Sequence, residues 1–161
     1  MPSTAADAER GAQVPKAAHD PSTMKCIVTP TSEAPLVPGR RDWVEYRDLG
    51  IEQASQGLIS THRITVNPAE DNGDKVQTTG WHYHDCTFQW IYLLEGWVEV
   101  QLEDGTTSRH EAGSVVFIPG GYGHNEVATS ERVDLLEIFM PPHPDTVAID
   151  VPPAWLPANP S

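Results

Sequence analysis

The sequence predicts a single all-β domain, a sandwich or small barrel built from short strands. The centre of the chain contains several short, partly alternating runs rich in β-branched and aromatic residues, and glycine or proline closes each run. No stretch keeps the period of an amphipathic helix over three turns. The 161 residues, 39% of them hydrophobic, are enough for one domain with a sizeable core.

The predicted strands follow one another along this central part. They cover residues 42–50, 58–66, 89–96, 97–102, 114–119 and 132–141. Turn signals separate them: Asn72-Gly73 in a polar stretch, Asp104-Gly105, and Pro119-Gly120-Gly121. Asp-Gly between two strand-like runs is typical of a hairpin. Many short strands at regular spacing therefore indicate the sandwich or barrel.

The two ends of the chain differ from the centre in composition. Residues 1–38 are rich in Ala, Pro, Ser and Thr, which predicts a mobile arm or a segment that orders only against a partner subunit. Residues 142–161 form a proline-rich tail that cannot continue a helix or a central strand, and Trp155 and Leu156 are candidates to hold it to the surface. The barrel is therefore expected to span residues 39–141.

Charge and cysteine content exclude several classes of partner. Ten Lys and Arg against 23 Asp and Glu give a net charge of -13, which argues against nucleic acid or an anionic membrane surface. No apolar run is long enough to span a bilayer, and the N-terminus lacks the apolar core of a signal peptide. Cys26 and Cys86 are too few for a disulfide framework. We expect a cytoplasmic protein.

Two of the seven histidines, His82 and His84, lie one residue apart in a strand-like stretch. Alternate side chains leave the same face of a strand, so both imidazoles are close enough to share one cation. Five residues later, Gln89 offers a neutral carbonyl oxygen as a further ligand. The other histidines outside this neighbourhood are interpreted as solvated or hydrogen-bonded: His19, His62, His110 and His143.

The residues around this pair follow a two-part spacing. The first part consists of Gly80, His82, His84, Gln89 and Gly96, and the second of Gly113, Pro119, Gly121 and His124. Over about residues 80–124 this pattern resembles the two-motif signature of the cupin superfamily. The resemblance implies a jelly-roll barrel with a metal in its mouth. It also implies that His82, His84 and His124 are ligands, with Gln89 in the fourth place.

Two positions depart from the family pattern. Gln89 stands where the family usually has Glu, and Ala128 stands where the second motif usually ends in Asn. A first shell of three imidazoles and an amide leaves the charge of a divalent metal uncompensated, which favours a substrate that binds as an anion. Alternatively, Gln89 does not coordinate, and the site has three histidines with open positions. Fe(II) is the favoured metal, and Ni, Mn, Zn and Cu stay open.

The pocket is expected to be apolar with few polar groups. Its candidate walls are Trp81, Phe88, Trp90, Ile91 and Phe117. Two residues are candidate catalytic groups: Tyr122, in the turn before His124, and Glu137, as a general base or a partner of a ligand. A surface salt bridge is the alternative for Glu137. Cys86 is interpreted as a small buried filler rather than a metal neighbour.

Three classes of function remain open at this stage. The favoured hypothesis is a three-histidine ferrous dioxygenase acting on a small anionic or enolisable substrate: a diketone, a hydroxylated aryl ketone or an aromatic acid. The second is a non-redox isomerase, cyclase or lyase, for example on an unsaturated uronate or a polyketide. Arg63, Arg109 and Arg132 could serve a sugar carboxylate, although the sequence does not place them in the pocket. The third is a ligand-binding cupin without chemistry.

Assembly is the last expectation. Small jelly rolls leave sheet edges that need cover, so we expect a homodimer in which the arm orders. The tryptophans expected to be exposed and to help cover these edges are Trp43, Trp97 and Trp155.

Overall fold

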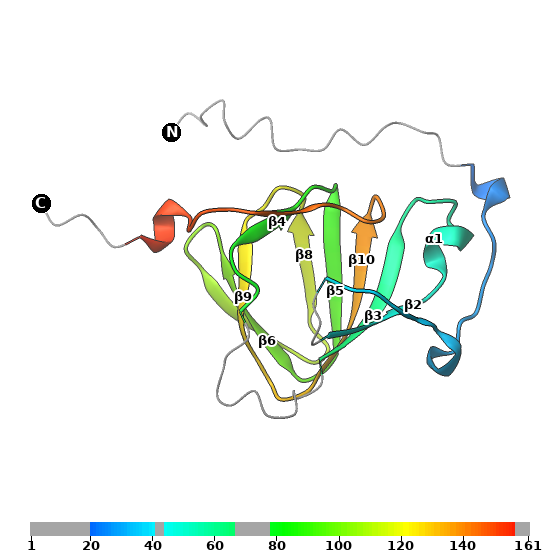
Figure 1. The fold of residues 1–161 in the computed structure, drawn as a ribbon, viewed down its shortest axis with the longest axis horizontal. Helices are drawn as coiled ribbons and strands as arrows, with labels where there is room; N and C mark the ends of the chain where they lie inside the picture. Colours follow the sequence, from blue (N-terminus) through cyan, green and yellow to red (C-terminus); the bar gives the residue numbers. More distant parts are fainter. Residues whose placement is uncertain (1–19, 41–43, 67–77, 157–161) are drawn as a thin grey trace, which may run out of the picture.

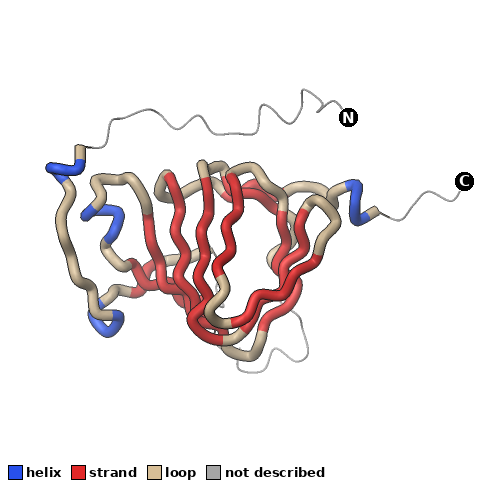
Figure 2. The backbone as a smooth tube through the Cα atoms, turned by 180° about the vertical axis from the view of Figure 1, so that it is seen from behind, coloured by secondary structure: helices blue, strands red, loops and turns tan. Residues whose placement is uncertain are grey.

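Two antiparallel β-sheets face each other and make up most of the molecule (Figures 1 and 2). The computed structural model describes residues 20–40, 44–66 and 78–156. The six-stranded sheet contains, in spatial order, β1 (Leu36–Val37), β2 (Val44–Asp48), β3 (Ser60–Val66), β10 (Val133–Met140), β5 (Phe88–Glu95) and β8 (Val115–Pro119). The five-stranded sheet contains β11 (Thr146–Ala148), β4 (His82–His84), β9 (His124–Thr129), β6 (Trp97–Leu102) and β7 (Thr107–Glu111). The all-β jelly-roll prediction is confirmed.

Helical structure among the described residues is limited to single turns. They are the α-helix α1 (Ile51–Ala54) and the 3₁₀ turns η2 (Pro21–Thr23), η3 (Thr31–Glu33) and η4 (Pro153–Trp155). No helix in this described part has the length and apolar character needed to cross a membrane.

The predicted strands and the Asp104-Gly105 hairpin are present. Strand β6 pairs with β7 in the register Trp97↔Glu111, and Asp104 Oδ1 accepts hydrogen bonds from the backbone and hydroxyl of Thr106 at 2.9 and 2.7 Å. The predicted turn at Asn72-Gly73 lies outside the described residues.

Strands β5 and β6 are consecutive in sequence but belong to opposite sheets. Gly96 between them has φ +79°, and a Cβ at this position would lie 2.1 Å from the carbonyl oxygen of Arg132. Only glycine fits both the conformation and the space, which is why the chain can cross between sheets here.

The core cluster lies between the two sheets. Leu93 and Val133 come from the six-stranded sheet, and Val98 and Val100 come from the five-stranded sheet. Each side chain is at most 9% exposed. Burial of an aliphatic side chain stabilises a fold by about 1.5–3 kcal/mol, so this cluster is a main source of cohesion between the sheets.

The described part of the predicted arm packs against its own barrel. Lys25 donates its backbone N–H to Ala54 at 2.9 Å, the Thr29 hydroxyl donates to the Leu49 carbonyl, and Ala34 is 2% exposed. Strand β1 then pairs with β2 at the sheet edge. For residues 20–38 the expectation of order only against a partner is therefore corrected, because other residues of the same chain supply their hydrogen bonds. Residues 1–19 lie outside the described part.

The proline-rich tail also packs on the barrel, across the end where β4 lies (Figure 1). Strand β11 adds to the edge of the five-stranded sheet beside β4, in keeping with the exclusion of this tail from central strands. Trp155 donates its indole N–H to the Leu102 carbonyl at 2.8 Å and contacts the Trp81 ring, whereas Leu156 is 56% exposed. The barrel therefore includes part of the tail.

The tryptophans expected at a dimer interface make contacts within their own chain where they are described. The Arg109 guanidinium lies 3.6 Å from the centre of the Trp97 ring, and Trp155 is held as above. Both are half-buried, and their part in a dimer interface stays a prediction. Trp43 lies outside the described residues.

Candidate metal centre

Strand pairing brings the three predicted histidine ligands together. His82 and His124 are direct partners across β4 and β9, and strand alternation sends His84 to the same face as His82. The ring centroids lie 4.3 Å apart for His82 and His124, and 5.0 and 5.4 Å apart for the two pairs with His84. One nitrogen of each ring falls within 4.8 Å of the others. The three buried imidazoles could therefore hold one metal ion.

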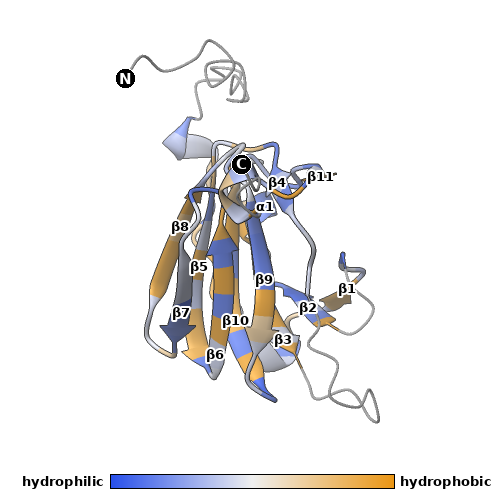
Figure 3. Cartoon of the chain, turned by 90° about the vertical axis from the view of Figure 1, so that its left-hand side faces the viewer, coloured by the Kyte–Doolittle hydropathy of each residue, from blue (hydrophilic) through white to orange (hydrophobic). Residues whose placement is uncertain are grey.

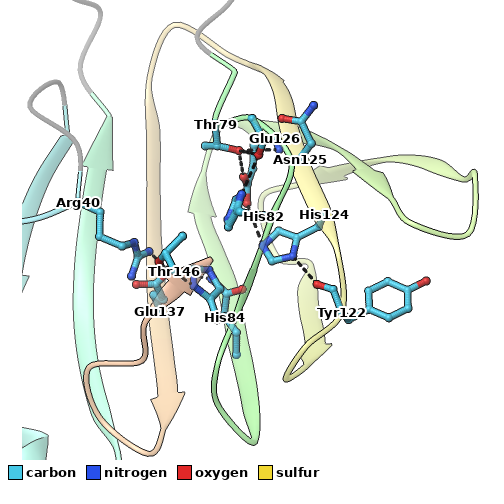
Figure 4. Close-up of polar contacts among 12 residues, drawn as sticks. Arg40, Thr79, His82, His84, Tyr122, His124, Asn125, Glu126, Glu137 and Thr146 are labelled. Atoms are coloured by element: carbon cyan, nitrogen blue, oxygen red, sulfur yellow. Dashed lines mark hydrogen bonds and ion pairs between the residues drawn. The ribbon is translucent and has the colours of Figure 1, made fainter. Parts of the chain in front are cut away.

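The Nδ1 atoms of these histidines all contact oxygen atoms (Figure 4). His82 Nδ1 lies 2.8 Å from the Gly80 carbonyl, and His124 Nδ1 lies 2.9 Å from the Tyr122 carbonyl. A carbonyl only accepts, so in both rings Nδ1 carries the hydrogen and Nε2 keeps its lone pair. His84 Nδ1 contacts the Thr146 hydroxyl at 3.1 Å. This is the usual arrangement around metal-binding histidines, in which the second nitrogen fixes the tautomer.

The turn before β9 is tied to the segment that follows β4. Gly120 donates its backbone N–H to Thr87, and Gly121 donates to His84, both at 3.0 Å. A Cβ on Gly120 would lie 1.5 Å from the Cys86 carbonyl oxygen. This close approach of two backbones, possible only without a side chain, holds His124 near His84.

Gln89 and Glu137 face the same cavity from the opposite sheet. Gln89 on β5 and Glu137 on β10 are each 3% exposed, and Gln89 Nε2 donates to Glu137 Oε1 at 2.9 Å. Arg40 donates to the same oxygen at 2.7 Å. Among the described residues, Gln89 Oε1 and Glu137 Oε2 have no hydrogen-bond partner. The alternative of a surface salt bridge for Glu137 is therefore corrected, since this carboxylate is buried.

Arg40 connects the buried carboxylate to the surface. Its side chain is 36% exposed, and its guanidinium lies 5.2 Å from the centre of the Phe139 ring. Burial alone would lower the pKa of Arg40, but the Glu137 carboxylate, with Tyr46, raises it overall. Arg40 is therefore a permanent positive charge at the edge of the cavity.

Glu126 is a second carboxylate on the cavity wall. It follows His124 by two residues on β9, its Oε1 lies 3.8 Å from His124 Nε2, and its other oxygen accepts from the Thr79 hydroxyl. Burial would raise the pKa of Glu126, but His124, His82 and Thr79 together lower it. The group is consequently an anion beside the histidine cluster at neutral pH.

The cavity has a volume of about 510 Å³. Beyond the polar groups above, its lining is mainly aliphatic: Val44, Ile64, Val66, Ile91, Leu93, Val98, Val100, Val116, Ile118, Val133 and Leu135. The expectation of an apolar pocket is met, but of the five candidate wall residues only Ile91 lines it.

The other candidate wall residues lie elsewhere. Phe88 stacks on Phe117 and Trp90 stacks on Tyr92, while Trp81 contacts Trp155. Gln89 on β5 faces inward and pairs with Ile118 on β8, and residues two positions from either one share that inward face. The aromatic residues of both strands stand at the positions between, so they face outward. In Figure 3, both strands carry strongly apolar segments.

Tyr122 does not reach the cavity with its side chain. Its ring points away from the three histidines (Figure 4), and only its carbonyl contributes to the site. Burial, together with Asp104 and Glu103, raises the pKa of its phenol. The expectation that Tyr122 is a catalytic group at the mouth is therefore corrected.

Three functional candidates were missed from the sequence: Arg40, Glu126 and Thr146. Glu126 could have been found, because alternation from His124 places it on the ligand face of a strand. Arg40 and Thr146 lie in segments outside or at the margin of the predicted barrel, and no local pattern connects them to the histidines.

The residues fit a divalent transition metal. The side chain of His124 is completely buried, and its Nε2 atom has no hydrogen-bond partner among the described residues, which is a costly state that a metal would relieve. Neutral imidazole nitrogens suit Fe, Ni, Cu and Zn, so the donor set leaves the identity of the metal open.

Comparison with known proteins agrees with this geometry. Residues 72–139 match the family model described as a cupin domain. The chain therefore carries a cupin domain in a cupin jelly-roll fold. No curated protein matches the sequence.

Several solved structures share the fold. The polyketide cyclase RemF from Streptomyces resistomycificus is 19% identical with a TM-score of 0.62, and the match covers 81% of this chain and 89% of that one. KdgF from Halomonas sp. is 16% identical with a TM-score of 0.58, covering 74% and 96%. Oxalate decarboxylase from Lactobacillus farciminis is 20% identical with a TM-score of 0.53, covering 71% of this chain and 33% of that one. At these identities the likeness establishes the fold alone.

The contact between Thr146 and His84 gives a first prediction. Thr146→Val removes the oxygen partner of His84 Nδ1 at nearly constant size, so metal affinity should fall about 10- to 100-fold. Thr146→Ser keeps the hydroxyl and should retain affinity close to that of the parent. Competition with a chelating dye measures both values. Equal affinities for the two variants would show that the hydroxyl does not support the ligand.

The cysteines give a second prediction. Cys86 is 2% exposed, and burial, with Asp85 and Glu137, raises the pKa of its thiol to about 11. It is therefore protonated at pH 8 and shielded, whereas Cys26 is exposed. Iodoacetamide should modify Cys26 in the native protein and Cys86 only after denaturation, as mass spectrometry of the peptides can show. Modification of both in the native state would contradict the buried-filler interpretation.

Proposed function

We propose that the chain is a metal-dependent enzyme, a three-histidine ferrous dioxygenase, acting on a small, largely apolar substrate that binds through an anionic oxygen. One observation carries this proposal: three buried imidazoles, each with an oxygen contact at Nδ1, gather beside a cavity of about 510 Å³ that His82 and His84 line together with many aliphatic side chains. Fe(II) held there would supply a positive charge and a redox centre.

The surrounding side chains define what such a substrate looks like. The imidazoles and the Gln89 amide bring no negative charge to a bound metal, and Glu126, the one anion beside the cluster among the described residues, would offset only part of a divalent charge, so the anionic oxygen of a substrate is a favourable partner there. The aliphatic walls exclude water and suit a hydrocarbon or aromatic body. Diketones, hydroxylated aryl ketones and aromatic acids meet both requirements. A sugar uronate is less well supported, because most of its hydroxyls would face aliphatic side chains.

Oxygen consumption tests the proposal. The full chain is prepared without oxygen, loaded with Fe(II), and given β-diketones, hydroxylated aryl ketones and aromatic acids in an oxygen electrode. Uptake that depends on both substrate and iron supports a dioxygenase, and the His124→Ala variant serves as the inactive control. Absence of uptake with every substrate class, in protein that holds iron, overturns it.

A second candidate is oxygen-independent proton transfer, as in a cyclase or isomerase. The observation that favours it is the pair of carboxylates on the cavity wall, Glu126 and Glu137, which can accept and return protons. One structural neighbour, RemF, is described as a polyketide cyclase. Zinc-loaded protein that converts an enolisable polyketide without oxygen would decide for this candidate. If the metal-bound protein converts neither the oxygenase substrates nor the polyketide, only a ligand-binding role remains.

We also propose a homodimer, now through a different surface. Strand β8 is an edge of the six-stranded sheet among the described residues, and its outward Val115 and Phe117 are 53% and 59% exposed. Pairing of two β8 edges across a two-fold axis would cover them. Light scattering should give twice 17.7 kDa for the full chain and a monomer for Phe117→Lys. A monomeric parent protein would rule the dimer out.

A further inference from the structure

Two acceptor atoms inside the cavity lack hydrogen-bond partners within the part of the chain that the structure describes. They are Oε2 of Glu137 and Oε1 of Gln89, on side chains that are each 3% exposed and that line the cavity. Buried polar atoms are normally paired, and those that are not are candidates for contact with a ligand. The rest of the lining combines aliphatic side chains with polar ones, among them Arg40, His84 and Glu126.

The hydrogen bonds around Glu137 explain why its second oxygen is left over. Arg40 and Gln89 both donate to Oε1, at 2.7 and 2.9 Å, and neither reaches Oε2. Because Gln89 donates through Nε2, its own oxygen is not engaged with Glu137. The Arg40 cation compensates the carboxylate charge. Both remaining oxygen atoms are therefore acceptors, so a ligand that donates a hydrogen bond would satisfy them.

The position of Glu137 relative to the histidines adds a geometric condition. The three histidines belong to the five-stranded sheet, whereas Gln89 and Glu137 belong to the six-stranded sheet that faces it. Two of these histidines, His82 and His84, line the same cavity as Gln89 and Glu137. If a metal at the histidines took Gln89 Oε1 as a further ligand, Glu137 Oε2 would still be left without a partner.

We propose that Glu137, positioned by Arg40 and Gln89, is a specificity-determining residue that accepts a hydrogen bond from a neutral hydroxyl of the substrate. The substrate class is then a hydroxylated aryl ketone. Its ketone or enolate end faces the histidines, and its ring hydroxyl faces the opposite sheet. Plain β-diketones and aromatic acids without a hydroxyl lack the second contact. This inference rests on the proposed function for the metal side of the substrate and adds the second recognition point.

Three matched ligands test the inference in zinc-loaded full-length protein, where no oxidation takes place. They are para-hydroxybenzoylacetone, para-methoxybenzoylacetone and benzoylacetone, and calorimetry gives their dissociation constants. A hydrogen bond to a charged group predicts that the hydroxyl ligand binds about 10- to 100-fold more tightly than the methoxy ligand. In Glu137→Gln this ratio should fall to about one, with little change for benzoylacetone.

The control is Glu45→Gln, the same chemical change at an exposed position on β2, which should keep the parent ratio. Circular dichroism and metal content establish that each variant is folded and loaded. An equal affinity for hydroxyl and methoxy ligands in the parent protein overturns the inference, as does an unchanged ratio in Glu137→Gln. Failure of all three ligands to bind overturns it too.

A second measurement does not need the variant to fold. In a crystal of the parent protein with para-hydroxybenzoylacetone, the phenol oxygen should lie within hydrogen-bond distance of Glu137 Oε2, and a phenol elsewhere overturns the inference. The proposed oxygenase function can fail separately: a ligand that binds with the expected ratio but is not oxidised by the iron form contradicts the reaction and not the subsite.

Discussion

Replacing His124 with alanine should abolish stoichiometric binding of a divalent metal. The side chain is completely buried, and its Nε2 faces the cluster without a hydrogen-bond partner, so its removal takes away one of three donors that no neighbour replaces. We expect the affinity for Zn(II) to fall by about a hundredfold or more, because a site held by two imidazoles lacks the usual set of three protein ligands. Calorimetric titration of metal-free protein measures the change.

The control for this variant is His62→Ala. His62 lies on β3 in the other sheet, contacts the Tyr46 ring at 6.2 Å, and is not part of the cluster. It removes an imidazole of the same size and should leave metal affinity within about twofold of the parent. Retention of full affinity in His124→Ala, or equal losses in the two variants, would contradict the assignment of the ligands.

The second large effect is expected for Gly120→Ala. A methyl group here would overlap the Cys86 carbonyl, which lies 1.5 Å from the Cβ position, and backbone hydrogen bonds on both sides prevent a simple retreat. We expect a loss of about 3–5 kcal/mol in the free energy of unfolding, the range reserved for severe steric conflict. Urea denaturation followed by tryptophan fluorescence provides the value.

Gly113→Ala is the matched comparison. Gly113 has φ +89°, but a Cβ there meets nothing within 4 Å, so this variant reports backbone strain alone, about 1–2 kcal/mol. Gly120→Ala instead measures the cost of the close contact between the turn before β9 and the segment that follows β4. If Gly120→Ala costs no more than Gly113→Ala, the turn is not in contact with the segment that follows β4.

The fold could be predicted from the sequence because its signals are local. Alternation in 97–102, the Asp104-Gly105 turn and the glycines that close each strand all concern neighbours in the chain. The histidine cluster was predictable for a related reason: alternation fixes His82 and His84, and the motif resemblance supplies His124. Their convergence needed only the pairing of β4 with β9.

The cavity wall was harder to predict because β5 is apolar on both faces. Composition could not tell Trp90, which faces out, from Ile91, which faces in. Counting from Gln89 would have decided the matter, since residues two positions apart share a face. Aromatic size was the wrong guide, because these rings stack on one another on the outside of the barrel.

The remaining site residues depend on contacts that are distant in sequence. Arg40 reaches Glu137 across 97 positions, and Thr146 reaches His84 across 62. Arg40 stands next to the segment whose composition indicated an arm, and Thr146 lies in the segment whose composition indicated a tail. Only the path of the chain over the barrel brings them to the cavity, and no local pattern encodes that path.

X-ray absorption spectroscopy of the zinc-loaded protein tests the central claim most directly. The metal should show about three imidazole nitrogens at roughly 2.0–2.1 Å, with the multiple scattering that imidazole rings produce. A first shell that contains sulfur, or only oxygen without imidazole scattering, would contradict the proposal that His82, His84 and His124 hold the metal.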